Sequence, residues 1–167
     1  MFQERNRRSI RLSNYDYSSP GAYFVTICTQ DHQCLFGNII DSSIVCNDAG
    51  FMVNQWYEEL GSKFASVSCD YFICMPNHVH FTIFLGQTRR SAPTNLNTIV
   101  QWFKTMTTND YIRGVKENGW QRFNKRLWQR NYWERVIRSE AELYKFRDYI
   151  KTNPIRWSLD KLNPELL

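Results

Sequence analysis

The sequence has few of the residues from which metal clusters and disulfide frameworks are usually built. It contains three histidines and five cysteines among 167 residues. The number of cysteines is odd, and no two of them form a Cys-x-x-Cys pair. These absences argue against a disulfide-stapled scaffold and against a cysteine-rich zinc site. We therefore expect buried, reduced thiols in a cytoplasmic protein.

Long apolar runs are also missing. No stretch approaches the roughly 20 apolar residues that span a membrane, and the first residues lack the apolar core of a signal peptide. No internal repeat and no low-complexity segment is found. With 43% hydrophobic and 16% aromatic residues, the chain can bury a substantial core. We expect one domain over residues 1–167, with a basic N-terminal arm at 1–14 and no membrane contact.

Positive charge is in excess. Lysine and arginine number 21 against 16 for aspartate and glutamate, which gives a net charge of +5. Such a balance favours a surface that binds polyanions, although each residue alone is also typical of an ordinary solvated charge. The candidates for contacts with a nucleic-acid backbone are Arg5, Arg7, Arg8, Arg11, Arg89, Arg90, Arg126 and Arg130. The candidates for base stacking, which could equally be core aromatics, are Trp128, Tyr132 and Trp133.

The order of apolar runs and turn signals predicts the fold class. Strands are expected at 22–29, 67–75 and 78–85, a hairpin over 34–46, and a strand or extended segment at 127–133. Helices are expected after caps at Asn47 or Asp48, at Asn95, and at Ser139, which forms a capping box with Glu142. Gly61 is expected to end the first helix, the stretch 114–125 to be irregular, and 86–93 to be a loop. Without a βαβ rhythm, this order predicts an α+β protein, an antiparallel sheet with helices mainly on one face.

The most informative stretch is Cys74-Met75-Pro76-Asn77-His78-Val79-His80-Phe81. Because side chains alternate along a strand, His78 and His80 project from the same face. Two imidazoles on one rigid element can bind a divalent metal, but an exposed strand pair that binds nothing has the same spacing. As ligands, we expect both to be exposed and to contribute little to packing.

A second pair of residues lies on the last predicted helix. Tyr149 and Asn153 are four residues apart and therefore neighbours on one helix face. Tyr149 borders an apolar stripe, so its hydroxyl can reach the surface or a cleft. A boundary tyrosine and a helix-end asparagine without function fit the same pattern. Asn153 precedes Pro154, so we expect it to leave helical geometry, with the helix ending near residue 151 or 152.

Four stretches together resemble a known family. They are Tyr15-Asp16-Tyr17 through Pro20-Gly21-Ala22-Tyr23-Phe24-Val25-Thr26, Met75 to His80, Leu127-Trp128-Gln129-Arg130-Asn131-Tyr132, and Tyr149-Ile150 through Asn153-Pro154. In this order, over nearly the whole chain, they resemble the REP-associated tyrosine transposases. These proteins are a branch of the single-tyrosine HUH nucleases.

The resemblance implies a ferredoxin-like sheet of the HUH nuclease type. It implies that His78, His80 and Asn153 bind a divalent metal, Mg²⁺ or Mn²⁺, and that Tyr149 is the nucleophile, with Tyr132 and Tyr144 as rivals. The implied activity is a single-strand DNA endonuclease and strand transferase, which cuts and rejoins through a 5′-phosphotyrosine. The implied partners are single-stranded or hairpin DNA at REP-like repeats, and a homodimer is left open.

Two other classes of function remain as alternatives at this point. One is a DNA-binding protein that has kept the HUH fold and lost the chemistry. The other is a small metalloprotein that uses the histidine pair for storage or redox, against which the basic excess and the lack of a third strong ligand count. A nicking assay with and without Mn²⁺ separates these readings.

Overall fold

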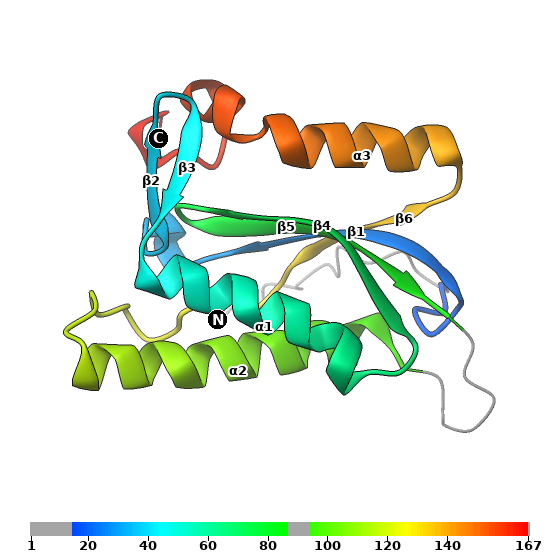
Figure 1. Ribbon diagram of the computed structural model, residues 1–167, viewed down its shortest axis with the longest axis horizontal. Helices are drawn as coiled ribbons and strands as arrows, with labels where there is room; N and C mark the ends of the chain where they lie inside the picture. The colour runs from blue at the N-terminus through cyan, green and yellow to red at the C-terminus, as the bar shows by residue number, and fades with distance from the viewer. Residues whose placement is uncertain (1–14, 87–93, 167) are drawn as a thin grey trace, which may run out of the picture.

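The computed structural model describes residues 15–86 and 94–166, and its centre is a four-stranded antiparallel sheet with the strand order β4-β5-β1-β6. A separate two-stranded hairpin, β2-β3, is attached to it (Figure 1). The sheet strands are β1 (Gly21–Cys28), β4 (Val67–Met75), β5 (His78–Leu85) and β6 (Trp133–Ile137), and the hairpin strands are β2 (Gly37–Ile40) and β3 (Ser43–Cys46).

The helices divide unequally between the two faces of this sheet. In Figure 1, α1 (Asp48–Lys63) and α2 (Leu96–Glu117) lie below the sheet, and α3 (Glu140–Thr152) lies above it. After α3 the chain continues in two short 3₁₀ helices, Pro154–Leu159 and Pro164–Leu166. The α+β class and the antiparallel sheet with most helices on one face are as predicted.

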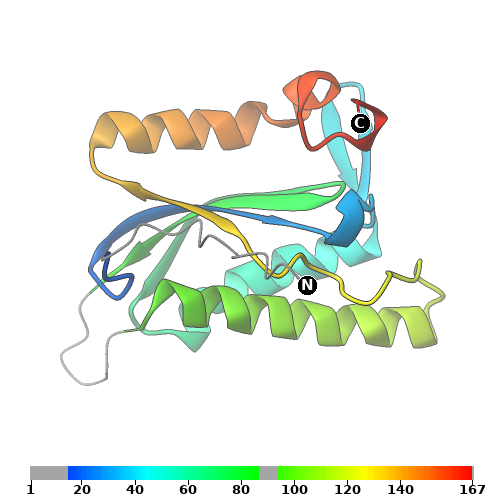
Figure 2. The same ribbon diagram turned by 180° about the vertical axis from the view of Figure 1, so that it is seen from behind.

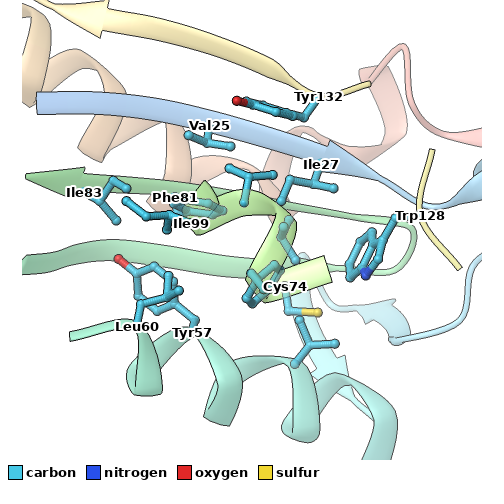
Figure 3. Packing of buried hydrophobic residues seen from close by; sticks show 14 of the residues in the cluster. Val25, Ile27, Tyr57, Leu60, Cys74, Phe81, Ile83, Ile99, Trp128 and Tyr132 are labelled. Carbon is cyan, nitrogen blue, oxygen red and sulfur yellow. The ribbon is translucent and has the colours of Figure 1, made fainter. Parts of the chain in front are cut away.

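The main core fills the space between the sheet and the helices α1 and α2. Strand β1 turns Tyr23, Val25 and Ile27 toward this side, and all three are fully buried. The alternate residues of β1, Phe24 and Thr26, therefore face α3. Figure 3 shows part of the core, including Phe81 and Ile99. A sheet covered on both faces explains why β5 is buried at nearly every position, including its polar ones.

Several expected boundaries are confirmed. The strands β4 and β5 have the predicted limits, the hairpin forms, and Asn47, Asn95 and Ser139 cap the three helices. The Oγ of Ser139 accepts the N–H of Glu142 at 3.1 Å, as the capping box requires. The expected loop at 86–93 lies outside the described residues, apart from Gly86.

Other expectations are wrong. Helix α1 passes through Gly61 to Lys63, and α2 continues to Glu117 into the stretch expected to be irregular. Asn153 keeps helical angles, φ −58° and ψ −43°, because the chain runs on into a 3₁₀ helix. Pro154 stands at the start of that helix, where its missing N–H needs no partner.

The environment of the thiols was only partly anticipated. Cys28 and Cys74 are buried, whereas Cys34 and Cys69 are exposed and Cys46 is intermediate. The exposed thiols stand on short connecting or edge positions, where nothing in the sequence distinguishes them from buried ones. Across the described residues, no helix combines the length and the apolar character that a membrane crossing needs.

Candidate active site

The two histidines stand on the sheet face that α3 covers. His80 is paired with Thr26 on the neighbouring strand, and His78 with Cys28. Their ring centroids are 4.5 Å apart, so both imidazoles share one small space. The prediction that they project from the same face is confirmed. The expectation that they are exposed is wrong, because α3 and the following 3₁₀ segment leave them 0% and 3% exposed.

The orientation of His78 is fixed by the asparagine before it. The Nδ2 of Asn77 donates to the carbonyl oxygens of His32 at 3.1 Å and of Leu162 at 2.7 Å. Its Oδ1 must then face His78, whose Nδ1 lies 2.8 Å away. An amide oxygen only accepts, so Nδ1 of His78 carries the proton and Nε2 keeps a lone pair.

His80 has a similar support on the next strand. Its Nδ1 lies 2.7 Å from the hydroxyl oxygen of Thr26, which can accept that N–H. The Nε2 atoms of both histidines are buried and have no hydrogen-bond partner. A buried ring nitrogen left unpaired on one side and supported on the other is the arrangement that metal-binding histidines show.

Asn153 supplies a third unpaired atom. It is 1% exposed, and its Oδ1 is buried without a hydrogen-bond partner. Among the described residues, no three histidines, cysteines or carboxylates stand close enough to hold a metal. A metal here would therefore use Nε2 of His78, Nε2 of His80 and Oδ1 of Asn153. Two nitrogen donors and one oxygen donor fit Mn²⁺ well and Mg²⁺ less well.

The electrostatics keep both histidines neutral. Burial lowers the pKa of His78 to about 3, and the nearby Asn153 amide only partly opposes this. Burial and then the neighbouring His78 lower the pKa of His80 well below its usual value. Neutral imidazoles can donate a lone pair, so both rings are ready as ligands at neutral pH.

Tyr149 lies directly beside this set of donor atoms. Its ring centroid is 5.1 Å from that of His80 and 5.9 Å from that of Phe24. Burial, followed by the charge of Asp160, raises the pKa of Tyr149, while the Asn153 amide lowers it. The phenol is therefore protonated at neutral pH. It lies next to the unpaired donor atoms of His78, His80 and Asn153.

Tyr132 and Tyr144, the other candidates for the nucleophile, do not lie beside these donor atoms. Tyr132 is only 6% exposed and belongs to the core on the other side of the sheet, where Lys104 of α2 lies 5.4 Å from its ring. Tyr144 is 60% exposed and stands over the guanidinium of Arg147. Trp128 is also buried in the core, so the expected base stacking is wrong for Trp128 and Tyr132. Trp133, at 60% exposure, stays a candidate.

Two hollows open on either side of Tyr149. One has a volume of about 560 Å³ and the other about 460 Å³. Both are lined by Thr26, His80, Tyr149 and Arg156. Thr26, Asn77 and Arg156 were missed from the sequence. For Asn77 a signal existed, since it directly precedes the histidine pair.

The two predicted arginines that the structure describes do not line the hollows beside Tyr149. Arg126 and Arg130 are exposed and line another hollow, of about 500 Å³, beside α2. The remaining candidates, Arg5, Arg7, Arg8, Arg11, Arg89 and Arg90, lie outside the described residues.

Comparison with known proteins places this geometry in context. No family model matches the sequence. An uncharacterised protein of Haemophilus influenzae (strain Rd) is 37% identical over 167 residues, which cover 94% of this chain and 93% of that protein. A second protein of that organism, provisionally named a REP-associated tyrosine transposase, is 25% identical over 157 residues, covering 87% of this chain and 77% of the relative.

A solved structure shares the fold. The structure of a REP-associated tyrosine transposase bound to a REP hairpin superposes with a TM-score of 0.60 and 16% identity, covering 92% of this chain and 76% of that one. At this identity the likeness shows the fold, the antiparallel sheet with its covering helices, which the two chains share. The chain belongs to the same family as the 37% identical Haemophilus protein. It is also similar in sequence to a protein provisionally named a REP-associated tyrosine transposase and in fold to a solved one, and these likenesses support a function of the transposase type.

Proposed function

We propose that this protein cuts and rejoins single-stranded DNA through a covalent bond to Tyr149. The observation that carries the proposal is the convergence of three buried, unpaired donor atoms, on His78, His80 and Asn153, beside the ring of Tyr149. Leaving three polar atoms buried without partners costs roughly 1–3 kcal/mol each. A bound divalent cation would satisfy all three at once.

The chemistry follows from the position of the phenol. The oxygen of Tyr149 attacks the phosphorus, the bond from phosphorus to the 3′ oxygen breaks, and the 5′ phosphate stays on the tyrosine. The phenol loses one proton and the departing 3′ oxygen gains one, so the step is balanced. A bound Mg²⁺ or Mn²⁺ would polarise the phosphate and offset its charge. Because the new ester keeps the energy of the broken bond, a 3′-hydroxyl can reverse the step without ATP.

The three residues around the tyrosine have separate tasks in this scheme. Asn77 and Thr26 fix Nδ1 of His78 and of His80, so the Nε2 atoms of both rings would be free to hold the metal. The helical turn from Tyr149 to Asn153 keeps the phenol and the amide oxygen on one side of α3.

The substrate proposal rests on the relatives and on charge. A REP hairpin is bound in the related solved structure, and we propose hairpin or single-stranded DNA with REP-like repeats for this chain as well. The net charge of +5 suits this substrate. The basic arm and the arginines at 89 and 90 are proposed as further backbone contacts.

The decisive experiment is the capture of the covalent adduct. Labelled single-stranded DNA is incubated with protein and Mn²⁺, denatured, and separated by electrophoresis. We expect a shifted band for the parent, for Tyr144→Phe and for Tyr132→Phe, and none for Tyr149→Phe, which retains the ring but has no attacking oxygen. An adduct with Tyr149→Phe would transfer the role to another tyrosine.

The same assay distinguishes the other outcomes. Cleavage without an adduct in any variant would indicate a metal-activated water and a simple nuclease. Hairpin binding without cleavage would indicate a DNA-binding protein that has kept the fold and lost the chemistry. Either result would contradict the proposed strand transfer.

A further inference from the structure

Beside the site, the edge strand β6 presents two side chains whose chemistry the proposed reaction leaves unused. Trp133 is directly opposite Thr26 in the sheet, and Arg135 is opposite Phe24. Paired residues on antiparallel strands point to the same face, so both side chains face the side of His80 and Tyr149. Figure 2 shows β6, in yellow, below α3 on the near side of the molecule. The free edge of the sheet thus borders the site.

The pairing of the strands gives the approximate spacing between His80 and the two residues of β6. His80, Thr26 and Trp133 are successive partners on β5, β1 and β6. Neighbouring strands lie about 4.8 Å apart, so the backbone of Trp133 is roughly 10 Å from that of His80. Arg135 is two residues further along the strand, about 6.7 Å from Trp133. The ring of Trp133 and the guanidinium of Arg135 therefore stand one after the other along the edge of the site.

Each of the two hollows beside Tyr149 contains one of these side chains. Trp133 lines the hollow of about 460 Å³, together with Leu159 and Leu162. Arg135 and Lys145 line the hollow of about 560 Å³, Lys161 lines the hollow of about 460 Å³, and Arg156 lines both. The acidic residues along the two hollows are Glu142, Asp148 and Asp160. Cations exceed carboxylates in each, and over the described residues none of these cations forms a salt bridge.

The exposure of Trp133 also leaves its ring available to a ligand. Its side chain is 60% exposed, and that of Leu159 in the same hollow is 82% exposed. A large ring held on a strand and open to solvent, next to cations, matches the stacking platforms of proteins that bind unpaired nucleic acid. Paired bases cannot use such a platform because both their faces are already stacked in the duplex.

We propose that the margin of β6 is a binding track for an unpaired DNA strand, on which Trp133 stacks a base and Arg135 and Arg156 contact the phosphates on either side. The proposal rests on the proposed function, since it names how the strand next to the cut is held. Stacking reads the face of a base, so Trp133 positions any unpaired base and has little preference for sequence.

The test measures binding without chemistry. A labelled unpaired oligonucleotide of about 12 nucleotides, within the usual range of single-strand sites, is titrated in EDTA by fluorescence anisotropy. We expect Trp133→Ala to weaken binding about tenfold and Trp133→Phe to weaken it far less, because phenylalanine also stacks. Tyr144→Ala is the matched control, since Tyr144 is equally exposed at 60% but lines neither hollow. A blunt duplex of the same sequence should bind the parent and Trp133→Ala alike.

The arginines are tested by salt dependence. Arg135→Ala should reduce the slope of log affinity against log salt by roughly 0.7, the contribution of one phosphate contact on a single strand. Arg138→Ala is its control, because Arg138 is exposed just beyond β6 and lines neither hollow. If Trp133→Ala binds the unpaired oligonucleotide as tightly as the parent, or if Tyr144→Ala loses as much affinity as Trp133→Ala, the proposed binding track is refuted.

These outcomes are separate from those of the adduct assay. If the parent forms no adduct but its binding in EDTA depends on Trp133, the track stands and the proposed chemistry fails. If the parent forms the adduct and its binding is indifferent to Trp133, the chemistry stands and the track is refuted.

Discussion

Replacing Asn77 should weaken metal binding although Asn77 cannot itself reach the metal. The side chain is fully buried and makes three hydrogen bonds: its Oδ1 accepts from His78, and its Nδ2 donates to the carbonyls of His32 and Leu162. In Asn77→Ala, the Nδ1–H of His78 loses its acceptor. The imidazole can then rotate or take the other tautomer, in which Nε2 no longer offers a lone pair.

The expected magnitude comes from these contacts. Loss of a residue that orients a metal-bound histidine typically reduces metal affinity 10–100-fold, or about 1.4–2.7 kcal/mol. The variant also leaves the carbonyl groups of His32 and Leu162, both partly buried, without this donor, which costs roughly 1–3 kcal/mol of stability for each group that water cannot reach. Mn²⁺ affinity is measured by isothermal titration calorimetry, and the free energy of unfolding by urea denaturation of the metal-free protein.

A matched control separates orientation from general destabilisation. Asn163 is also buried, at 4% exposure, and its side chain also bonds to backbone, to Trp157 O at 3.1 Å and to Glu165 N at 3.1 Å. It touches no proposed ligand, so Asn163→Ala should lose stability and keep Mn²⁺ affinity. If Asn77→Ala binds Mn²⁺ as tightly as the parent, the assignment of the His78 tautomer is refuted.

Three further outcomes are expected. Asn153→Ala should raise the Mn²⁺ concentration needed for half-maximal cleavage several-fold and change the maximum less, because a neutral amide is a weak ligand; an unchanged Mn²⁺ titration would contradict this. Arg147→Met should lower the free energy of unfolding at pH 7 in urea, because Arg147 makes two hydrogen bonds to Asp70, at 2.9 and 2.7 Å. Burial raises the pKa of Asp70, but its hydrogen bonds, foremost those from Arg147, outweigh it and leave the pKa below the ordinary value. The contribution is therefore complete above the unfolded pKa of about 3.9 and is lost as pH falls through the lower folded pKa, so parent and variant should converge in acid. Replacing Arg7 and Arg8 together should flatten the salt dependence of DNA binding if the arm contacts phosphates, at roughly 0.7 per contact; equal slopes would make the arm a solvated tail.

The sequence predicted those parts of the site that local rules determine. Strand alternation placed His78 and His80 on one face, and helical spacing placed Tyr149 and Asn153 on one side of α3. The capping residue Ser139 located the start of that helix. Each of these rules acts over a few residues, so it needs no knowledge of the rest of the fold.

What depends on distant parts of the chain was not predicted. The burial of the histidine pair comes from α3 and the segment after it, about 70 residues further along the chain. Strand β6 was missed because Trp133-Glu134-Arg135-Val136-Ile137 carries two charges in five residues. Edge strands often carry charges, which discourage pairing with other chains, and this makes them hard to distinguish from loops.

The unequal covering of the sheet explains why the site lies where it does. Two helices, α1 and α2, pack side by side on one face, and that face holds the main hydrophobic core. A single helix about 10 Å wide lies on the other face, where the outer strands are about 14 Å apart. One helix cannot fill this area, so hollows remain on both sides of Tyr149. Polar side chains such as His80 and Thr26 are buried enough there to be held rigidly, and a substrate strand can still reach them. A second helix on that face would seal the site, so α3 must both carry the tyrosine and leave the margin of β6 open.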